Sequence, residues 1–210
     1  MYHHMVTNDL TQPSRTRDRD ATRKRFIAAA GRVLARDGFA KLGVNTIAAE
    51  AKADKVLIYR YFGGLQGLME AYAADGDFWP SADELLEGIA TNLSGAEAAA
   101  QMFRNYRIAL ADRPLTLEIL AWETIERNEI TAILESQRSN ASAELINRLA
   151  DRSPAHEGLE IGATLIAAAL SYLIVRSRTI ARYSGLDLRS DEAWNRIDLE
   201  IQRLLTAAYD

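Results

Sequence analysis

The chain has 210 residues, of which 48% are apolar, and its formal net charge is −4. This length allows a sizeable core, arranged as one larger domain or two smaller ones. The chain has no cysteine, which excludes disulfides and thiolate metal sites. Without a secretory N-terminal apolar segment or a membrane-length apolar run, it is expected to be cytoplasmic.

The cationic residues are concentrated at the N-terminal end. Residues 1–62 hold 12 Lys/Arg and 6 Asp/Glu, a balance of +6, whereas the remainder has a balance of −10. A basic end on an acidic chain predicts a polyanionic partner for that end, although a solvated charge run is the alternative. We expect residues 1–20 to form a disordered basic arm that rests on phosphates or reaches a minor groove.

The segment from Ala21 to Asp37 predicts a helix that is followed by a helix-turn-helix. Gly38 is placed to end the first helix in the left-handed conformation. Thr46 to Phe62 then reads as two short helices joined by a tight turn, with Asp54 capping the second. Such a second helix suits the DNA major groove. We predict DNA contacts from Asn45, Thr46, Lys52, Lys55, Tyr59 and Arg60, with Lys55 at base edges and the Tyr59 hydroxyl on a phosphate.

These motifs resemble the N-terminal domain of TetR-family transcriptional regulators. The resemblance covers residues 20–70 and rests on Ala21-Thr22-Arg23, Gly38-Phe39, Ile47-Ala48 and the ending Tyr59-Arg60-Tyr61-Phe62. It implies an all-α fold, with a three-helix helix-turn-helix domain over 21–66 and a helical-bundle ligand-binding and dimerisation domain over 67–210. It also implies a homodimeric repressor that binds a palindromic operator in double-stranded DNA and is released by a small molecule.

The chain departs from the family pattern at four positions. Lys52 stands where the turn usually has a glycine, and Val56 stands where the second helix has another. Leu57 replaces a phosphate-gripping hydroxyl residue, and Leu65 replaces a phosphate-contacting lysine. These departures keep an alternative open: a dimeric small-molecule- or protein-binding helical module that has lost specific operator binding.

Beyond residue 62, helical segments are predicted at about 65–74, 82–93, 95–111, 115–150, 156–184 and 190–209, with no strand. Ile161 to Val175 carries no charge and is too short to span a bilayer. A helix that is apolar all round must be buried on every side, so we expect it to face its own core and a second subunit. A wholly intrachain core is the alternative. The predicted dimer interface comprises Leu165, Tyr172, Trp194, Ile197, Ile201 and Leu204.

Large aromatic residues on these segments predict a cavity for a small, largely apolar effector, although an aromatic stripe at helical spacing is also typical of simple core. The candidates are Phe78, Trp79, Phe103, Tyr106, Trp122 and Tyr172. His156 is the single histidine outside the first four residues, so nucleophilic triads and histidine metal sites lack their parts. We therefore expect no enzyme activity, no cofactor and no metal site.

Overall fold

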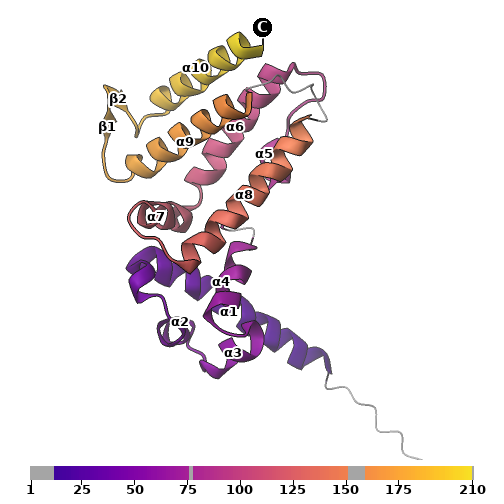
Figure 1. The fold of residues 1–210 in the computed structure, drawn as a ribbon, viewed down its shortest axis with the longest axis vertical. Coiled ribbons are helices and arrows are strands. Elements are labelled where there is room, and N and C mark those ends of the chain that lie inside the picture. The colour runs from indigo at the N-terminus through magenta and orange to yellow at the C-terminus, as the bar shows by residue number, and fades with distance from the viewer. Residues whose placement is uncertain (1–11, 76–77, 151–158, 210) are drawn as a thin grey trace, which may run out of the picture. The chain divides into compact units, whose positions relative to one another are not determined.

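The computed structural model describes residues 12–75, 78–150 and 159–209, and Figure 1 traces their course. Helices occupy most of these residues, which confirms the all-α prediction. Contacts between residues divide the chain into an N-terminal unit that ends at Tyr72 and a C-terminal unit that begins at Ala73.

The N-terminal unit is built on a long first helix. Its elements are α1 (Gln12–Asp37), the 3-10 turn η1 (Phe39–Lys41), α2 (Val44–Ala51), α3 (Val56–Phe62) and α4 (Leu65–Ala73). Both η1 and α2 pack against α1. The fully buried side chains at the centre of this unit include Phe26, Val33, Leu34, Ile47, Ile58, Leu68 and Met69.

The boundary between the units lies inside α4, whereas the sequence placed it between residues 66 and 67. Gly31 of α1 explains the difference, because a Cβ at that position would lie 2.5 Å from Cε2 of Tyr72. The glycine therefore allows the Tyr72 ring to pack directly on α1. Most of α4 thus belongs with the first helices.

Residues 12–20 are helical, so the prediction of a disordered arm is wrong for them; residues 1–11 lie outside the described part. Two cations of α1 lie over the aromatic end of α3. The Arg19 guanidinium is 5.5 Å from the centre of the Tyr61 ring, and the Arg23 guanidinium is 5.1 Å from that of Phe62. These cation–π contacts tie the start of α1 to the unit, and the helix continues outward from that anchored turn.

The C-terminal unit is arranged around α6 (Gly95–Ala111). The short α5 (Ala82–Leu86), α7 (Pro114–Glu123), α9 (Leu159–Ser177) and α10 (Asp191–Tyr209) all pack against α6, while α8 (Glu129–Ala150) packs against α5. In Figure 1, α9 and α10 run alongside α6. A capping box between Ser94 and Glu97 starts α6. The core between these helices includes Leu85, Met102, Phe103, Leu110, Leu170, Ile174, Ile201 and Leu205.

Three predictions for the elements of the C-terminal unit are wrong. The helix expected over 115–150 is interrupted between α7 and α8, where the Asn128 Oδ1 accepts hydrogen bonds from the backbone N–H of Ile130 and of Thr131. The segment predicted over 82–93 is helical only to Leu86. Contrary to the expectation of no strand, α9 is followed by an antiparallel hairpin of β1 (Arg182–Tyr183) and β2 (Leu186–Asp187).

Within the described ranges, no helix combines the length and the apolarity that a membrane crossing requires.

Candidate nucleic-acid interface and ligand cavity

A tight turn sets the angle between α2 and α3. Lys52 ends α2 in the left-handed conformation, with φ 51° and ψ 47°. The backbone N–H of Ala53 returns to the carbonyl of Ala48 at 3.1 Å, and the Asp54 Oδ1 accepts from the N–H of Val56 at 2.9 Å. The predicted capping role of Asp54 is therefore confirmed, since its carboxylate satisfies a free donor at the start of α3.

The exposed side chains of the two helices are mainly polar. All six residues predicted to contact DNA are exposed: Asn45, Thr46, Lys52, Lys55, Tyr59 and Arg60. The Lys55 Nζ donates to the Asn45 Oδ1 at 3.2 Å, so the structure joins a residue of α2 to the start of α3. Ile58, on the opposite side of α3, is fully buried and anchors the helix. Exposure is a requirement for DNA contact; the contacts themselves stay a prediction.

Apart from the exposed Val56, the remaining side chains of α3 serve the packing of the unit. Phe62 contacts Phe26 edge-on, with ring centres 6.3 Å apart. Gly63 then ends α3 at φ 78°, where a residue without Cβ is favoured. Leu57 and Leu65, two of the departures from the family pattern, are half-buried. They offer no polar atom to a phosphate.

Two cations of α1 are engaged within the protein. The Arg32 Nε and the Arg36 Nη1 bind the two carboxylate oxygens of Glu50 at 2.8 and 2.9 Å. These hydrogen bonds lower the pKa of the Glu50 carboxyl below its ordinary value, with Arg32 contributing most. These two ion pairs join α1 to the end of α2. Because Arg32 and Arg36 are engaged in them, we expect the DNA contacts to come from the cations nearer α3.

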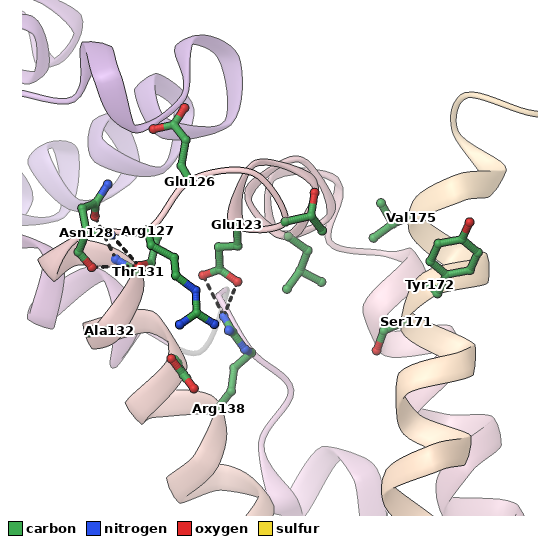
Figure 2. Close-up of a pocket in the computed structure, with 13 residues that line it drawn as sticks. Glu123, Glu126, Arg127, Asn128, Thr131, Ala132, Arg138, Ser171, Tyr172 and Val175 are labelled. Atoms are coloured by element: carbon green, nitrogen blue, oxygen red, sulfur yellow. Dashed lines mark hydrogen bonds and ion pairs between the residues drawn. The ribbon is translucent and has the colours of Figure 1, made fainter.

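The C-terminal unit contains a cavity of about 530 Å³ between α7, α8 and α9. Leu120 and Val175 give it apolar walls, and Tyr172 adds an aromatic ring. The rest of the lining is mainly polar or charged: Glu123, Thr124, Glu126, Arg127, Asn128, Thr131, Glu135, Arg138 and Ser171. In Figure 2 the side chains of α9 face those of α7 and α8 across this space.

An ion pair forms one wall of the cavity. The Arg138 Nη1 of α8 lies 2.9 Å from the Glu123 carboxylate of α7, and the Arg138 guanidinium lies over the Trp79 ring. Burial raises the pKa of Glu123, an effect that the bond from Arg138 opposes. Figure 2 shows Arg127 extending toward the same pair. Sequence reasoning missed Arg138, because only the tertiary fold brings residues 123 and 138 together.

Of the six aromatic candidates, only Tyr172 lines this cavity. Phe78, Phe103 and Tyr106 are buried in the core, and Trp79 packs partly against it. The Tyr106 hydroxyl is 2.6 Å from the Ser171 Oγ, which satisfies it inside the protein. Trp122 is half-buried and is not part of the lining. The aromatic stripe is therefore core rather than cavity wall, because large apolar rings bury most surface where helices cross.

The six candidates for a dimer interface divide into exposed and packed residues. Leu165, Tyr172 and Leu204 are 66%, 50% and 56% exposed. Ile201 is a correction: it is buried in the core of this same chain. Trp194 and Ile197 pack partly against that core, and the Trp194 Nε1 donates to the Leu188 carbonyl at 2.9 Å. On α9, Leu170 and Ile174 are buried while Ile161 and Leu165 are exposed, so one side of this helix is not covered within the chain, contrary to the alternative of a wholly intrachain core.

Comparison with known proteins finds a family whose model matches the helix-turn-helix. The model of the family described as bacterial regulatory proteins, tetR family, matches residues 26–72. The HTH-type transcriptional repressor SCO4008 of Streptomyces coelicolor is 29% identical over 135 residues, which are 64% of this chain and 66% of that protein. Over the matched residues, the N-terminal unit is a helix-turn-helix of the TetR type. The match supports a DNA-binding regulatory role for this unit.

Solved TetR-family structures share the fold over most of the chain. A regulator (HI0893) from Haemophilus influenzae has a TM-score of 0.62 at 19% identity, over 91% of this chain and 98% of that one. The regulator FadR from Bacillus subtilis, in complex with stearoyl-CoA, has a TM-score of 0.61 at 18% identity, over 87% and 96%. At these identities the likeness concerns the fold alone, so the chemistry of the present cavity has to be argued from its own residues.

Proposed function

We propose that this protein is a TetR-family repressor that binds a palindromic operator as a homodimer and is released by a small effector. The observation that carries the proposal is the exposed surface of α2 and α3, where Lys55 and Asn45 lie together beside Tyr59. A lysine and an amide are suited to hydrogen-bond base edges, and a tyrosine hydroxyl is suited to a phosphate. A regulator of this kind acts in the cytoplasm, and no catalytic step is assigned to it.

The homodimer is proposed from the exposed side of α9. Ile161, Leu165, Ala168 and Tyr172 recur at helical spacing on that side, and three of them are among the large exposed apolar side chains. A contiguous apolar stripe on a helix is costly in water and is removed from water by a second copy. Two copies related by a twofold axis would present two reading helices to the two halves of a palindrome.

The effector is proposed to occupy the cavity between α7, α8 and α9. The sequence predicted a largely apolar effector, but the lining favours a molecule with an apolar body and at least one polar or charged group. Leu120, Val175 and Tyr172 would receive the body, while Glu123 and Arg138 would bond the polar group. A ligand that competes for either partner of this ion pair would disturb the link between α7 and α8.

The half-buried Leu57 and Leu65 favour a second candidate function. Each stands where a phosphate contact is expected from the family resemblance, and each neutralised phosphate contributes about −0.9 to the slope of log K against log salt. A chain that lacks several such contacts would retain the dimer and the cavity without specific operator binding. It would then act as a dimeric helical binding module.

A mobility-shift titration separates the two functions. The probe is the DNA that flanks the protein's own gene, compared with a random duplex of equal length at rising salt. Preferential retention with a steep salt dependence supports the repressor. Equal affinity for both duplexes at low salt would exclude the repressor function and support the binding module.

The occupancy of the cavity can be tested with anilinonaphthalene sulfonate, a dye with an aromatic body and one charged group. The parent is expected to bind it with enhanced fluorescence, and Val175→Trp, which fills the cavity, is expected to lose most of that signal. Leu199→Trp, at an exposed position of α10 outside the cavity, is the matched control. Equal signals from all three proteins would contradict the assignment of this cavity.

A further inference from the structure

One large aliphatic side chain is exposed on the mainly polar surface of α2 and α3. Val56, the first residue of α3, is 61% exposed, while Ile58 two residues later is fully buried. Val56 therefore contributes little to the core of its unit. Its neighbours on this surface are polar, since Lys55 precedes it and Tyr59 follows one turn later.

The backbone of Val56 has no donor left for DNA. Its N–H is already bonded to the Asp54 Oδ1 at 2.9 Å. The side chain is thus the only group that this residue presents outward. A valine side chain is branched at Cβ and has one strongly preferred rotamer in a helix, so its two methyl groups are held in a fixed direction.

In the major groove, the base edges present hydrogen-bond donors and acceptors at every base pair, but only thymine presents an aliphatic group, its C5-methyl. Lys55 and Asn45 can satisfy the polar atoms of neighbouring base edges. The exposed Val56 side chain, next to these two residues, would contact polar atoms of the bases unless a thymine methyl group faces it. Contact with a thymine methyl removes both apolar surfaces from water.

We propose that Val56 is a specificity-determining residue that reads the C5-methyl group of one thymine in each operator half-site. This inference rests on the proposed DNA-binding function and adds to it a base identity. It predicts that this thymine lies next to the base pair contacted by Lys55, because the two residues are adjacent at the start of α3.

The test exchanges thymine for uracil, which differs from it only in lacking the C5-methyl group. The operator is first obtained by selection from random duplexes with the full chain. Each thymine pair at symmetric positions is then replaced by deoxyuridine, and Kd is measured by fluorescence anisotropy at fixed salt. Removing one buried methyl group from each half-site is expected to weaken binding about fourfold per half-site, which is about sixteenfold for the dimer, at one symmetric position.

Val56→Ala identifies the residue responsible. The variant is expected to bind the thymine operator more weakly than the parent does, and to lose the uracil effect at that one position while keeping any effect elsewhere. Ile146→Ala, at a half-exposed position of α8, is the matched control and should behave as the parent. Because Val56 is exposed, the thermal unfolding midpoint of Val56→Ala is expected to match that of the parent within about 1 °C on the usual scale for surface substitutions.

The outcomes separate this inference from the function on which it rests. Specific operator binding with every uracil tolerated, or with the uracil effect unchanged in Val56→Ala, overturns the role of Val56 alone. Failure of the selection to yield any preferred duplex overturns both the repressor function and this inference. Loss of the uracil effect at a single symmetric position in Val56→Ala supports the inference.

Discussion

Lys52→Gly is expected to stabilise the N-terminal unit while weakening its binding to DNA. Lys52 lies at φ 51° and ψ 47°, where an L side chain costs about 1–2 kcal/mol. Glycine removes that cost but adds conformational freedom to the unfolded chain, which offsets about 0.4–1 kcal/mol. The difference predicts a net gain of about 0.5–1 kcal/mol in the free energy of unfolding of this unit.

Hydrogen exchange of the α2 amides measures this gain. The three tryptophans lie in the C-terminal unit, so their fluorescence follows that unit and not the turn. We expect the amides of Ile47 and Ala48 to exchange about two- to fivefold more slowly in Lys52→Gly. The matched control is Lys24→Gly, the same chemical change at an exposed position inside α1, which should lose about 1 kcal/mol. Faster exchange in both variants would refute the reasoning from backbone strain.

The same substitution removes a cation from the proposed DNA surface. If Lys52 contacts a phosphate in each half-site, the slope of log K against log salt should fall by about 1.8 for the dimer. A variant that is more stable yet binds more weakly would show that Lys52 is retained for its charge. An unchanged slope would remove Lys52 from the interface.

Three further predictions concern the C-terminal unit. Leu165→Arg should shift the protein from dimer to monomer in sedimentation velocity, whereas Leu199→Arg, equally exposed on α10, should not; a dimeric Leu165→Arg would move the interface elsewhere. Tyr106→Phe should lower the free energy of unfolding by about 0.5–1.5 kcal/mol, measured by denaturant unfolding followed by tryptophan fluorescence, because the hydrogen bond to Ser171 is lost. An unchanged unfolding midpoint would show that this hydrogen bond does not stabilise the unit. Burial raises the pKa of the Glu123 carboxyl above its ordinary value of 4.5. The contribution of this group to the free energy of unfolding is therefore full below pH 4.5, and it is lost as the pH rises through the folded-state pKa. Glu123→Gln should therefore gain stability relative to the parent as the pH rises from about 4 to 7, and a difference that falls with pH would contradict this.

The helix-turn-helix could be predicted because its determinants are local. The capping carboxylate of Asp54 precedes α3 by two residues, and the buried Ile47 and Ile58 recur at helical spacing around the turn. The conformation of Lys52 was not predicted, since lysine has no preference for the left-handed region. In the structure, the backbone hydrogen bonds of Lys52 and Ala53 to the carbonyls at the end of α2 accompany this conformation.

The break between α7 and α8 was missed although a signal for it exists. Asn128 followed by Thr131 makes reciprocal side-chain bonds to the backbone, which is an N-terminal cap of α8. The segment before it holds neither glycine nor proline, so the sequence shows no interruption of the helical period there. The hairpin after α9 was missed for another reason, because two-residue strands are too short to show an alternating pattern.

The sequence by itself determined the helical architecture, the position of the reading helix and the separation of a basic end from an acidic remainder. Caps, helical periodicity and charge balance act over a few residues, so they can be read without coordinates. Only the tertiary structure decided that Phe103 and Tyr106 belong to the core, that Glu123 and Arg138 form a cavity wall, and that Ile201 is buried in the core of this same chain. An apolar side chain has the same hydrophobicity in a core, a cavity or an interface, and which of these it occupies depends on the partner that the rest of the fold brings against it.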